Sequence, residues 1–195
     1  GTLTDGDIRR ALVQDSSLEQ KVSAIMNIQY RFIVSGEDAL TALTKIRHEG
    51  ITILPVLDQS KTIVGVLDLE KTRSLLPVHA FLMAGGEGQR LRPLTDSTPK
   101  PLLEIGGKAI IQYNLELLAA YGVKRVTIAV RYLGGQIKTA FGDGNSFGLE
   151  IDYIDEEEPG GTMGALRLAQ NVLQDDLLVM NSDILTNLDL EDFYL

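Results

Sequence analysis

Short apolar runs alternate along the second half of the chain with stretches in which apolar residues recur every three or four positions. The runs predict buried strands at 78–83, 125–130, 149–154 and 177–181. The amphipathic stretches predict helices near 109–121, 134–141 and 163–173. This alternation predicts a mostly parallel sheet with helices on both faces. Ligands of such sheets bind beyond the carboxyl ends of the strands, which here are the loops at 84–95 and 155–164 and the residues after Asn181.

The pattern differs before Pro77. Ala39, Leu40, Leu43 and Ile46 recur at helical spacing and predict a helix over about 37–47, which ends before Gly50. Ser35 with Asp38 forms a capping box at its start. Two β-branched runs at 51–57 and 61–68 predict a hairpin, followed by a short helix through Leu75. Residues 1–14 resemble the ending at 65–76, so this part reads as one truncated and one whole copy of a unit of about 60 residues.

The organisation predicts two domains, residues 1–77 and 78–195. The chain opens at what reads as the end of a strand, and it stops in the first turns of an expected helix at 190–195. We therefore expect both domains to be truncated. The fold class is α/β, with a partial module followed by a mostly parallel sheet.

Composition excludes several classes of protein. The 195 residues are 44% hydrophobic and contain no cysteine, so a packed core is expected and thiol catalysis or zinc fingers are excluded. No apolar run reaches the roughly 18 residues of a membrane span, and no signal peptide pattern is present. The net charge of −9 argues against nucleic acid as a partner. We expect a cytoplasmic protein without membrane contact.

One segment departs from the acidic background. Residues 79–195 carry nine basic and 17 acidic groups, whereas residues 85–108 within them carry four basic and three acidic groups. Gly85, Gly86 and Gly88 follow a predicted buried strand, where backbone N–H groups without a Cβ can approach an anion closely. The cations follow at Arg90, Arg92, Lys100 and Lys108. The alternative is a surface turn with solvated charges; neither a Walker A loop nor G-x-G-x-x-G is present.

This segment resembles the nucleotidyltransferases that join a sugar 1-phosphate to a nucleoside triphosphate. Their signature of a glycine-rich loop, Arg, Pro-Leu-Thr and Pro-Lys-Pro is matched by Gly85, Gly86, Gly88, Arg90, Pro93, Leu94, Thr95, Pro99, Lys100 and Pro101. EEEPGGTMGA at 156–165 and VMNSDIL at 179–185 are similar to two further motifs of the family. The pattern is most similar to the guanylyltransferases, and it implies a Rossmann-like sheet.

The resemblance implies roles for individual residues. Arg90 and Lys100 would be catalytic, with Arg90 on the triphosphate and Lys100 between donor and acceptor phosphates. The nucleotide would contact Ala84, Gly85, Gly86, Gly88, Glu156, Gly161 and Thr162. Glu156 would face the base, and a carboxylate only accepts hydrogen bonds. Guanine offers adjacent N1–H and N2–H donors, so GTP is favoured; the alternative for Glu156 is a solvated acidic loop.

Asp183 is the expected metal ligand. It follows a buried strand, and Mg²⁺ commonly takes one or two carboxylates together with substrate phosphates. The alternative is a helix cap or an ordinary loop residue. The resemblance implies a second metal aspartate beyond Leu195, so we expect the 195-residue chain alone to be inactive.

The first half resembles CBS domains, the paired regulatory modules that often bind adenine nucleotides. The matching residues are Gly1, Thr4 and Asp7, with ILPVLD at 53–58 and GVLD at 65–68. Asp7 suits the two ribose hydroxyls and Thr4 suits a phosphate. In the second copy, Asp68 stands where the first has Thr4, and Lys71 stands where the first has Asp7. At most one adenine nucleotide is therefore expected. A packing module without a ligand is the alternative.

Together these features predict a Mg²⁺-dependent enzyme that transfers a nucleoside monophosphate, GMP from GTP by preference, to a sugar 1-phosphate. The competing function is a nucleotide sensor without catalysis. The acceptor sugar is left open between mannose, glucosamine and a heptose. A homo-oligomer is expected because CBS modules commonly pair.

Overall fold

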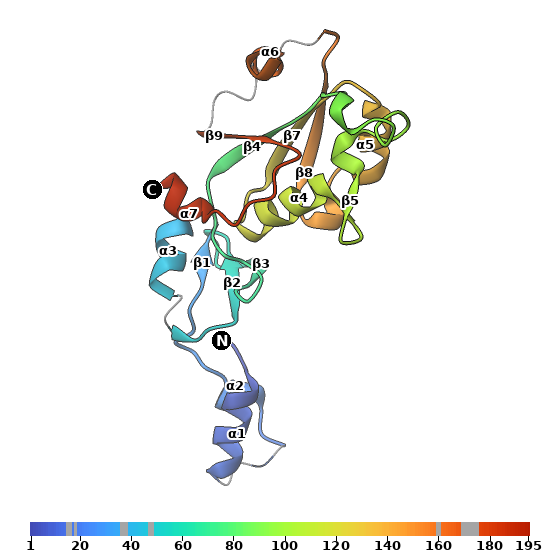
Figure 1. Ribbon diagram of the computed structural model, residues 1–195. Coiled ribbons are helices and arrows are strands. Elements are labelled where there is room, and N and C mark those ends of the chain that lie inside the picture. Colours follow the sequence, from blue (N-terminus) through green and yellow to red (C-terminus); the bar gives the residue numbers. More distant parts are fainter. Residues whose placement is uncertain (15–16, 18, 36–38, 47–48, 159–160, 169–175) are drawn as a thin grey trace. The chain divides into compact units, whose positions relative to one another are not determined.

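The computed structural model describes residues 1–14, 17, 19–35, 39–46, 49–158, 161–168 and 176–195. The chain divides into two compact units, Gly1–Leu69 and Glu70–Leu195 (Figure 1). This division falls eight residues before the boundary predicted at Pro77.

The first unit contains a small mixed sheet and three helices. Its helices are α1 (Asp5–Val13), α2 (Val22–Ile25) and α3 (Ala39–Ile46). Its strands β1 (Ile33–Val34), β2 (Ile53–Leu57) and β3 (Ile63–Asp68) lie in the order β1-β2-β3. β1 pairs with β2 in parallel and β2 pairs with β3 as the predicted antiparallel hairpin. Leu43 and Leu54 are fully buried. The capping box predicted at Ser35 and Asp38 involves residues outside those described.

The short helix predicted through Leu75 is wrong. Residues 72–77 form no helix, and their backbone bonds to the end of a helix of the second unit: Leu76 N–H donates to Tyr121 O at 2.9 Å. Gly122 adopts φ +71°, and a Cβ there would lie 2.5 Å from the Ser74 carbonyl oxygen. This close backbone contact and the extended preference of a residue before proline outweigh the local helical pattern.

The second unit is built on a parallel sheet of four strands. They are β4 (Val78–Ala84), β7 (Arg125–Val130), β8 (Glu150–Asp155) and β9 (Asp176–Asn181), in the order β8-β7-β4-β9. All three neighbouring pairs are parallel. The helices are α4 (Ile110–Ala120), α5 (Gly134–Phe141), α6 (Gly161–Leu168) and α7 (Leu190–Tyr194). A two-stranded hairpin, β5 (Glu104–Ile105) with β6 (Lys108–Ala109), precedes α4.

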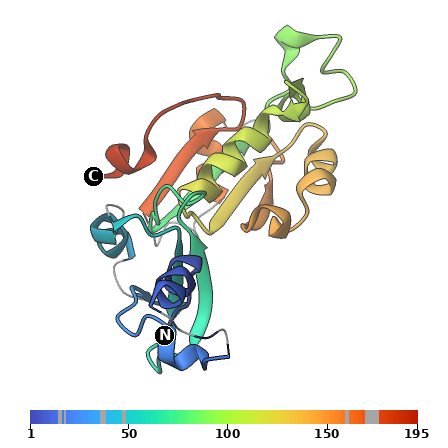
Figure 2. The same cartoon turned by 90° about the horizontal axis from the view of Figure 1, so that it is seen from below.

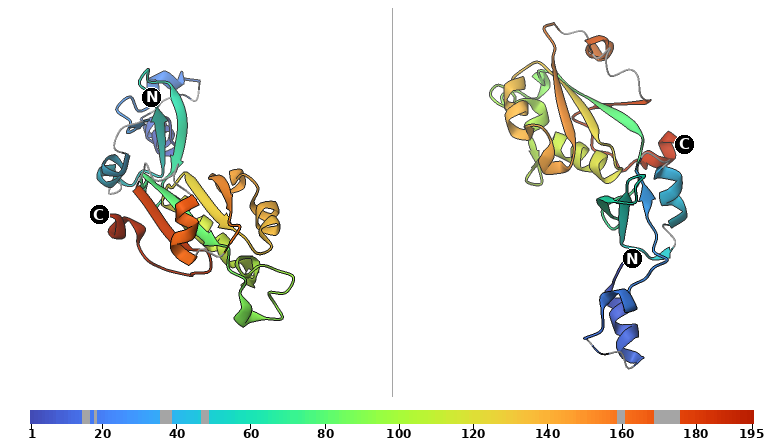
Figure 3. Two further views of the ribbon diagram at one scale, coloured as in Figure 1. Left: turned by 90° about the horizontal axis from the view of Figure 1, so that it is seen from above. Right: turned by 180° about the vertical axis from the view of Figure 1, so that it is seen from behind.

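Helices cover both faces of this sheet, as predicted. Figure 2 shows α4 in front of the sheet when it is seen from below, and the left view of Figure 3 shows α6 in front when it is seen from above. Because side chains alternate along a strand, Phe81 of β4 and Ala129 of β7 share one face and form a buried cluster with Ala165 of α6. The strand and helix predictions from Val78 onward are confirmed for the described residues. The predicted part of a helix at 169–173 lies outside the described residues.

Candidate functional site

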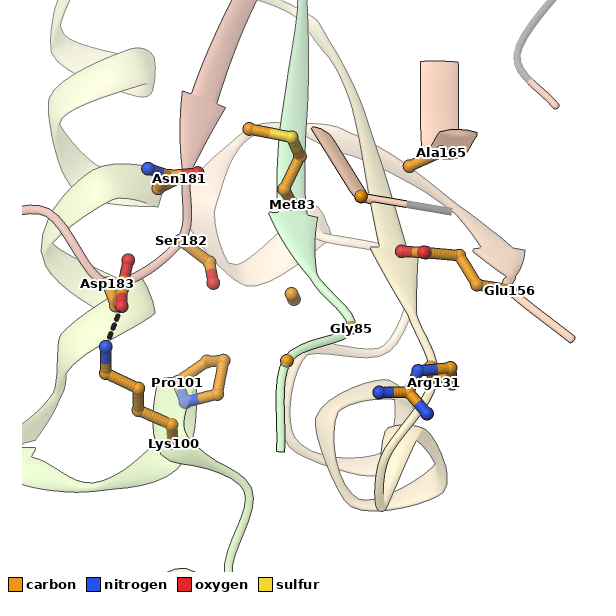
Figure 4. A pocket seen from close by; sticks show the side chains of 13 residues that line it. Met83, Gly85, Lys100, Pro101, Arg131, Glu156, Ala165, Asn181, Ser182 and Asp183 are labelled. Carbon is orange, nitrogen blue, oxygen red and sulfur yellow. Dashed lines mark hydrogen bonds and ion pairs between the residues drawn. The ribbon is translucent and has the colours of Figure 1, made fainter. Parts of the chain in front are cut away.

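The strand order places a crevice at the carboxyl end of β4. The chain proceeds from β4 to β7 and β8 on one side and then returns to pair β9 on the other side of β4. Ligands of open α/β sheets bind at such a switch point. A cavity of about 320 Å³ lies there (Figure 4). Its lining residues are Met83, Ala84, Gly85, Gly86, Lys100, Pro101, Arg131, Glu156, Gly161, Ala165, Asn181, Ser182 and Asp183.

The glycine-rich loop lies between the two charged ends of this cavity. Gly85 and Gly86 line it, and no described heavy atom lies within 4 Å of a Cβ built on Gly86. Gly88 has a different role, because it adopts φ +64° and a Cβ there would lie 3.0 Å from Thr95 Cγ2 and 3.1 Å from Lys100 Cβ. Gly86 therefore leaves the backbone open toward a ligand, whereas Gly88 allows the loop to pack on its own continuation.

Hydrogen bonds from the following segments hold this loop in place. The buried Thr95 donates its hydroxyl to Gly88 O at 3.0 Å. Tyr132, which lies just before α5, donates to Thr95 O at 3.0 Å and to Asp96 O at 3.1 Å. The glycine loop is thus preorganised by contacts that lie outside the cavity.

One end of the cavity carries an ion pair between Lys100 and Asp183. Lys100 begins the short 3-10 helix η3 (Lys100–Leu102), and Asp183 follows β9. Figure 4 shows the two side chains pointing toward each other beside Pro101. The buried Asn114 of α4 donates to Ser182 O at 3.0 Å, and Ser182 N–H donates to Met83 O at 3.1 Å. These bonds fix the backbone that presents Asp183.

The other end carries Arg131 and Glu156, which follow β7 and β8. Burial raises the pKa of the Glu156 carboxyl, and the charge of Arg131 opposes this increase in part. Arg131 Nη1 donates to Glu87 Oε1 at 3.4 Å. The pKa of Glu87 is lowered, first by the hydrogen bond from Gln89 and further by Arg131 and Arg92. The cavity therefore has two charged ends. Between them the backbone is open at Gly86, whereas the Glu156 carboxylate packs against Gly85, where a Cβ would lie 2.6 Å from Glu156 Oε1.

Most of the predicted site residues of the second unit meet in this cavity. Ala84, Gly85, Gly86, Lys100, Glu156, Gly161 and Asp183 line it. Gly88, which faces Thr95 and Lys100, is not among the lining residues. Arg90, in the 3-10 helix η2 (Gln89–Leu91), is exposed and is not among the lining residues, so this geometry does not bring it to the predicted triphosphate position. The side chain of Thr162 lies outside what the structure describes.

The predicted CBS residues Thr4 and Asp7 form a capping box at the start of α1. The Asp7 carboxylate accepts from Thr4 N–H at 2.7 Å, from Thr4 Oγ1 at 2.6 Å and from Arg10 at 2.5 Å. These bonds lower the pKa of Asp7, with the Thr4 hydroxyl as the largest cause. The pair has a structural role here, and its contact with a nucleotide stays a prediction.

Three cavity residues had no predicted role: Asn181 and Ser182, which lie in the VMNSDIL motif, and Arg131, which lies outside every motif. A signal was present for each, because all three lie at or just after the carboxyl end of a strand of the parallel sheet. Arg131 was missed because it belongs to none of the motifs on which the resemblance rested.

The acidic side chains fit a magnesium ion only in part. Asp183 supplies one carboxylate at the cavity, which suits an ion that takes its other ligands from substrate phosphates and water. Within the described ranges, no three His, Asp or Glu side chains form a metal-binding cluster. No helix formed by the described residues combines the length and apolar character needed to cross a bilayer.

The parallel sheet, the switch-point cavity and the glycine loop beside a lysine define a nucleotide-binding domain of the α/β class. Residues 79–194 match the family model described as Nucleotidyl transferase. The chain belongs to this family.

Curated relatives and solved structures agree with this assignment. The mannose-1-phosphate guanylyltransferase of Mycobacterium tuberculosis is 40% identical over 114 residues, which are 58% of this chain and 32% of that protein. The N-acetylmuramate alpha-1-phosphate uridylyltransferase of Neisseria meningitidis serogroup B is 42% identical over 114 residues, 56% of this chain and 48% of that protein. The chain thus spans about a third to a half of these relatives.

Among solved structures, HddC from Yersinia pseudotuberculosis, complexed with GMP-PN, superposes with a TM-score of 0.53 and 32% identity. The match covers 60% of this chain and 52% of that one. The nucleotidyltransferase fold is therefore shown. The two curated relatives differ in the nucleotide, since one is a guanylyltransferase and the other a uridylyltransferase.

Proposed function

We propose that this protein transfers GMP from GTP to a sugar 1-phosphate, releasing pyrophosphate. The observation that carries the proposal is the pairing of Lys100 with Asp183 at one end of a cavity that Gly85 and Gly86 also line. A lysine beside the backbone of a glycine-rich loop suits the phosphates of a nucleotide. We also propose a cytoplasmic location, because the proposed donor is a nucleoside triphosphate.

The reaction asks the protein to position groups and to counter charge. An oxygen of the sugar phosphate attacks the α-phosphorus of the triphosphate. The new phosphorus–oxygen bond forms while the bond from the α-phosphorus to the bridging oxygen breaks, and pyrophosphate leaves with the electron pair. No covalent nucleophile on the protein is needed, so catalysis rests on alignment and electrostatic stabilisation.

Lys100 would counter the negative charge of the phosphates during this reaction. Lys100 is paired with Asp183, and a bound triphosphate would replace the carboxylate as its partner. Asp183 would then be available to hold Mg²⁺, which supplies neutralisation of the phosphate charge when bound. Gly85 and Gly86 would offer backbone N–H groups along the chain of phosphates.

Glu156 supports guanine as the base. Its carboxylate lies at the opposite end of the cavity from Lys100 (Figure 4). It can accept from both N1–H and N2–H of guanine, whereas uracil and thymine present a donor beside acceptors. The comparisons do not decide the base, because the relatives include a guanylyltransferase, a uridylyltransferase and a thymidylyltransferase, so the proposal for guanine rests on Glu156. Competition binding of GTP, UTP and dTTP tests it, and a preference for UTP or dTTP would contradict it.

The enzymatic step is tested by pyrophosphate release from the full-length protein. We expect release that requires both Mg²⁺ and a sugar 1-phosphate, and we expect Lys100→Ala to lower kcat by about 10²- to 10³-fold, as for loss of one preorganised charge contact. Lys108→Ala is the matched control, because Lys108 pairs with Glu116 outside the cavity. Binding of GTP without any release would support a nucleotide sensor instead.

For the first unit we propose a regulatory CBS module. The order of its elements, β1, α3, β2 and β3, supports this, with a parallel pair followed by an antiparallel hairpin. Thr4 and Asp7 would contact the phosphate and ribose of one adenine nucleotide. We expect Asp7→Asn to weaken AMP binding. Asp5→Asn, two residues earlier in the first turn of α1, is expected to leave AMP binding unchanged. Equal AMP affinity of the two variants would show that Asp7 is not part of the site.

A homo-oligomer of these modules stays a prediction.

A further inference from the structure

Arg131 lies level with Glu156 at the edge of the parallel sheet. Val130 of β7 and Asp155 of β8 are register partners, so Arg131 and Glu156 each follow one member of that pair. Glu156 N–H donates to Val130 O at 2.8 Å, which extends the ladder by one step. Neighbouring strands are about 4.8 Å apart. The two side chains therefore leave the sheet side by side, and both line the cavity (Figure 4).

Arg131 is not required to neutralise Glu87 by itself. Glu87 accepts from Gln89 Nε2 at 2.9 Å and lies 3.9 Å from Arg92 as well as 3.4 Å from Arg131. A guanidinium carries five N–H donors in a planar fork, so one long bond to Glu87 leaves donors for a ligand. The Arg131 side chain is 25% exposed, so water competes only in part with a ligand for its N–H donors.

We propose that Arg131 is a second base-reading residue, which donates to O6 and N7 of guanine while Glu156 accepts from N1–H and N2–H. This inference rests on the proposed function and deepens it. O6 lies next to N1–H on guanine, so a donor beside a carboxylate matches the order of groups along the base. Arginine paired with O6 and N7 is also the commonest specific contact to guanine in nucleic-acid recognition.

The same pair of side chains disfavours the other bases. Adenine presents an N6 amino group where guanine has O6, so two sets of donors would face each other at Arg131. Uracil and thymine have no N7. The proposed function puts the triphosphate at the Lys100 end of the cavity, which leaves Arg131 at the end where the base would bind.

The experiment compares GTP, 7-deaza-GTP, ITP and UTP by calorimetric titration of the full chain. 7-deaza-GTP lacks the N7 acceptor and reports on Arg131, whereas ITP lacks the N2 amino group and reports on Glu156. We expect the unmodified protein to bind GTP about tenfold more tightly than 7-deaza-GTP. Arg131→Met is expected to reduce this ratio to about one while it retains the preference for GTP over ITP.

Two further variants complete the test. Arg92→Met removes another cation beside Glu87 from outside the cavity, and it is expected to keep both ratios. Arg131→Leu likewise offers no hydrogen-bond donor, and it is expected to lose the 7-deaza discrimination as Arg131→Met does. It serves in its place if Arg131→Met does not fold.

The outcomes separate this inference from the proposed function. An undiminished 7-deaza ratio in the Arg131 variants, or no such ratio in the unmodified protein, would overturn the role of Arg131 while the preference for GTP over ITP stands. An equal loss of affinity for GTP, 7-deaza-GTP and UTP would assign Arg131 to the phosphates and also overturn it. UTP binding as tightly as GTP, with no discrimination against ITP, would reject the guanine assignment itself.

Discussion

The carboxyl group of Glu156 is partly removed from water, and this burial raises its pKa above the ordinary value of 4.5. Below the ordinary pKa, folded and unfolded chains both hold the proton and the group costs nothing. As the pH rises through the raised pKa, the folded state must ionise a buried carboxyl, and stability is lost. The ionised Glu156 carboxylate therefore lowers the stability of the folded protein when no ligand binds it.

We accordingly expect Glu156→Gln to raise the melting temperature of the nucleotide-free chain at pH 8, with an advantage that shrinks toward zero near pH 4. GTP affinity should fall in the same variant, because an amide cannot accept two hydrogen bonds from one edge. Thermal melts across this pH range measure the first effect. Glu157→Gln, at the exposed neighbouring position, is the control, and an equal gain there would show that the effect is general charge.

Alanine substitutions at two glycines of the loop are expected to have different effects. Gly88→Ala places a Cβ at φ +64° and 3.0 Å from Thr95, so we expect a loss of at least about 1–2 kcal/mol in the free energy of unfolding. Gly86→Ala meets open space, so stability should change by less than about 0.5 kcal/mol while triphosphate binding weakens. Urea unfolding and GTP titration of both variants check this, and equal stability losses would contradict it.

At the scale of single residues, the sequence correctly predicted cavity residues that lie in contiguous motifs. Lys100, Asp183 and Glu156 meet in one cavity as expected, although 83 positions separate the first two. Arg90 does not line that cavity, because spacing along a loop does not determine which way a 3-10 turn presents its side chains. Arg131 was missed because its role depends on the register of β7 and β8, which local pattern does not reveal.

Among the elements, α4 does more than cover the sheet. Leu115 and Leu118 are fully buried, and Asn114 on the same helix donates to Ser182 O next to Asp183. Helix packing and the position of the cavity carboxylate are therefore linked through one side chain.

We expect Asn114→Ala to lower the free energy of unfolding by about 1–3 kcal/mol, since it leaves the buried Ser182 carbonyl without this donor. GTP affinity should fall as well, because Asp183 is no longer held opposite Lys100. Gln112→Ala is the control on the same helix, where the lost partner is Glu116 at a half-buried position. Unchanged nucleotide affinity in Asn114→Ala would show that α4 does not support the site.

Prediction of elements was successful where hydrophobic periodicity was strong and failed where tertiary contact decided. β7 and α5 begin and end where the pattern predicted, because buried parallel strands and amphipathic helices have distinct periods. The helix expected before Pro77 does not form, because its backbone bonds to the end of α4 instead. A sequence pattern cannot show such a bond between segments about 45 residues apart.

At the scale of the whole molecule, the chain divides into two compact units, and the cavity belongs to the second alone. A ligand stabilises the unit that binds it by mass action, by about 2.7 kcal/mol at a concentration of 100 Kd. We expect GTP to slow hydrogen exchange at 84–88, 156–158 and 181–183 and to leave the amides of Gly1–Leu69 unchanged. Slowed exchange in the first unit alone would place the nucleotide there.

The arrangement of the cavity is tested most directly by a crystal structure of the full-length protein with a non-hydrolysable GTP analogue. We predict the guanine edge against Glu156 and Arg131, the phosphates along Gly85 and Gly86, and Lys100 turned from Asp183 to the phosphate chain. A nucleotide bound outside this cavity, or one with its base at Lys100 and its phosphates at Glu156, would contradict the account.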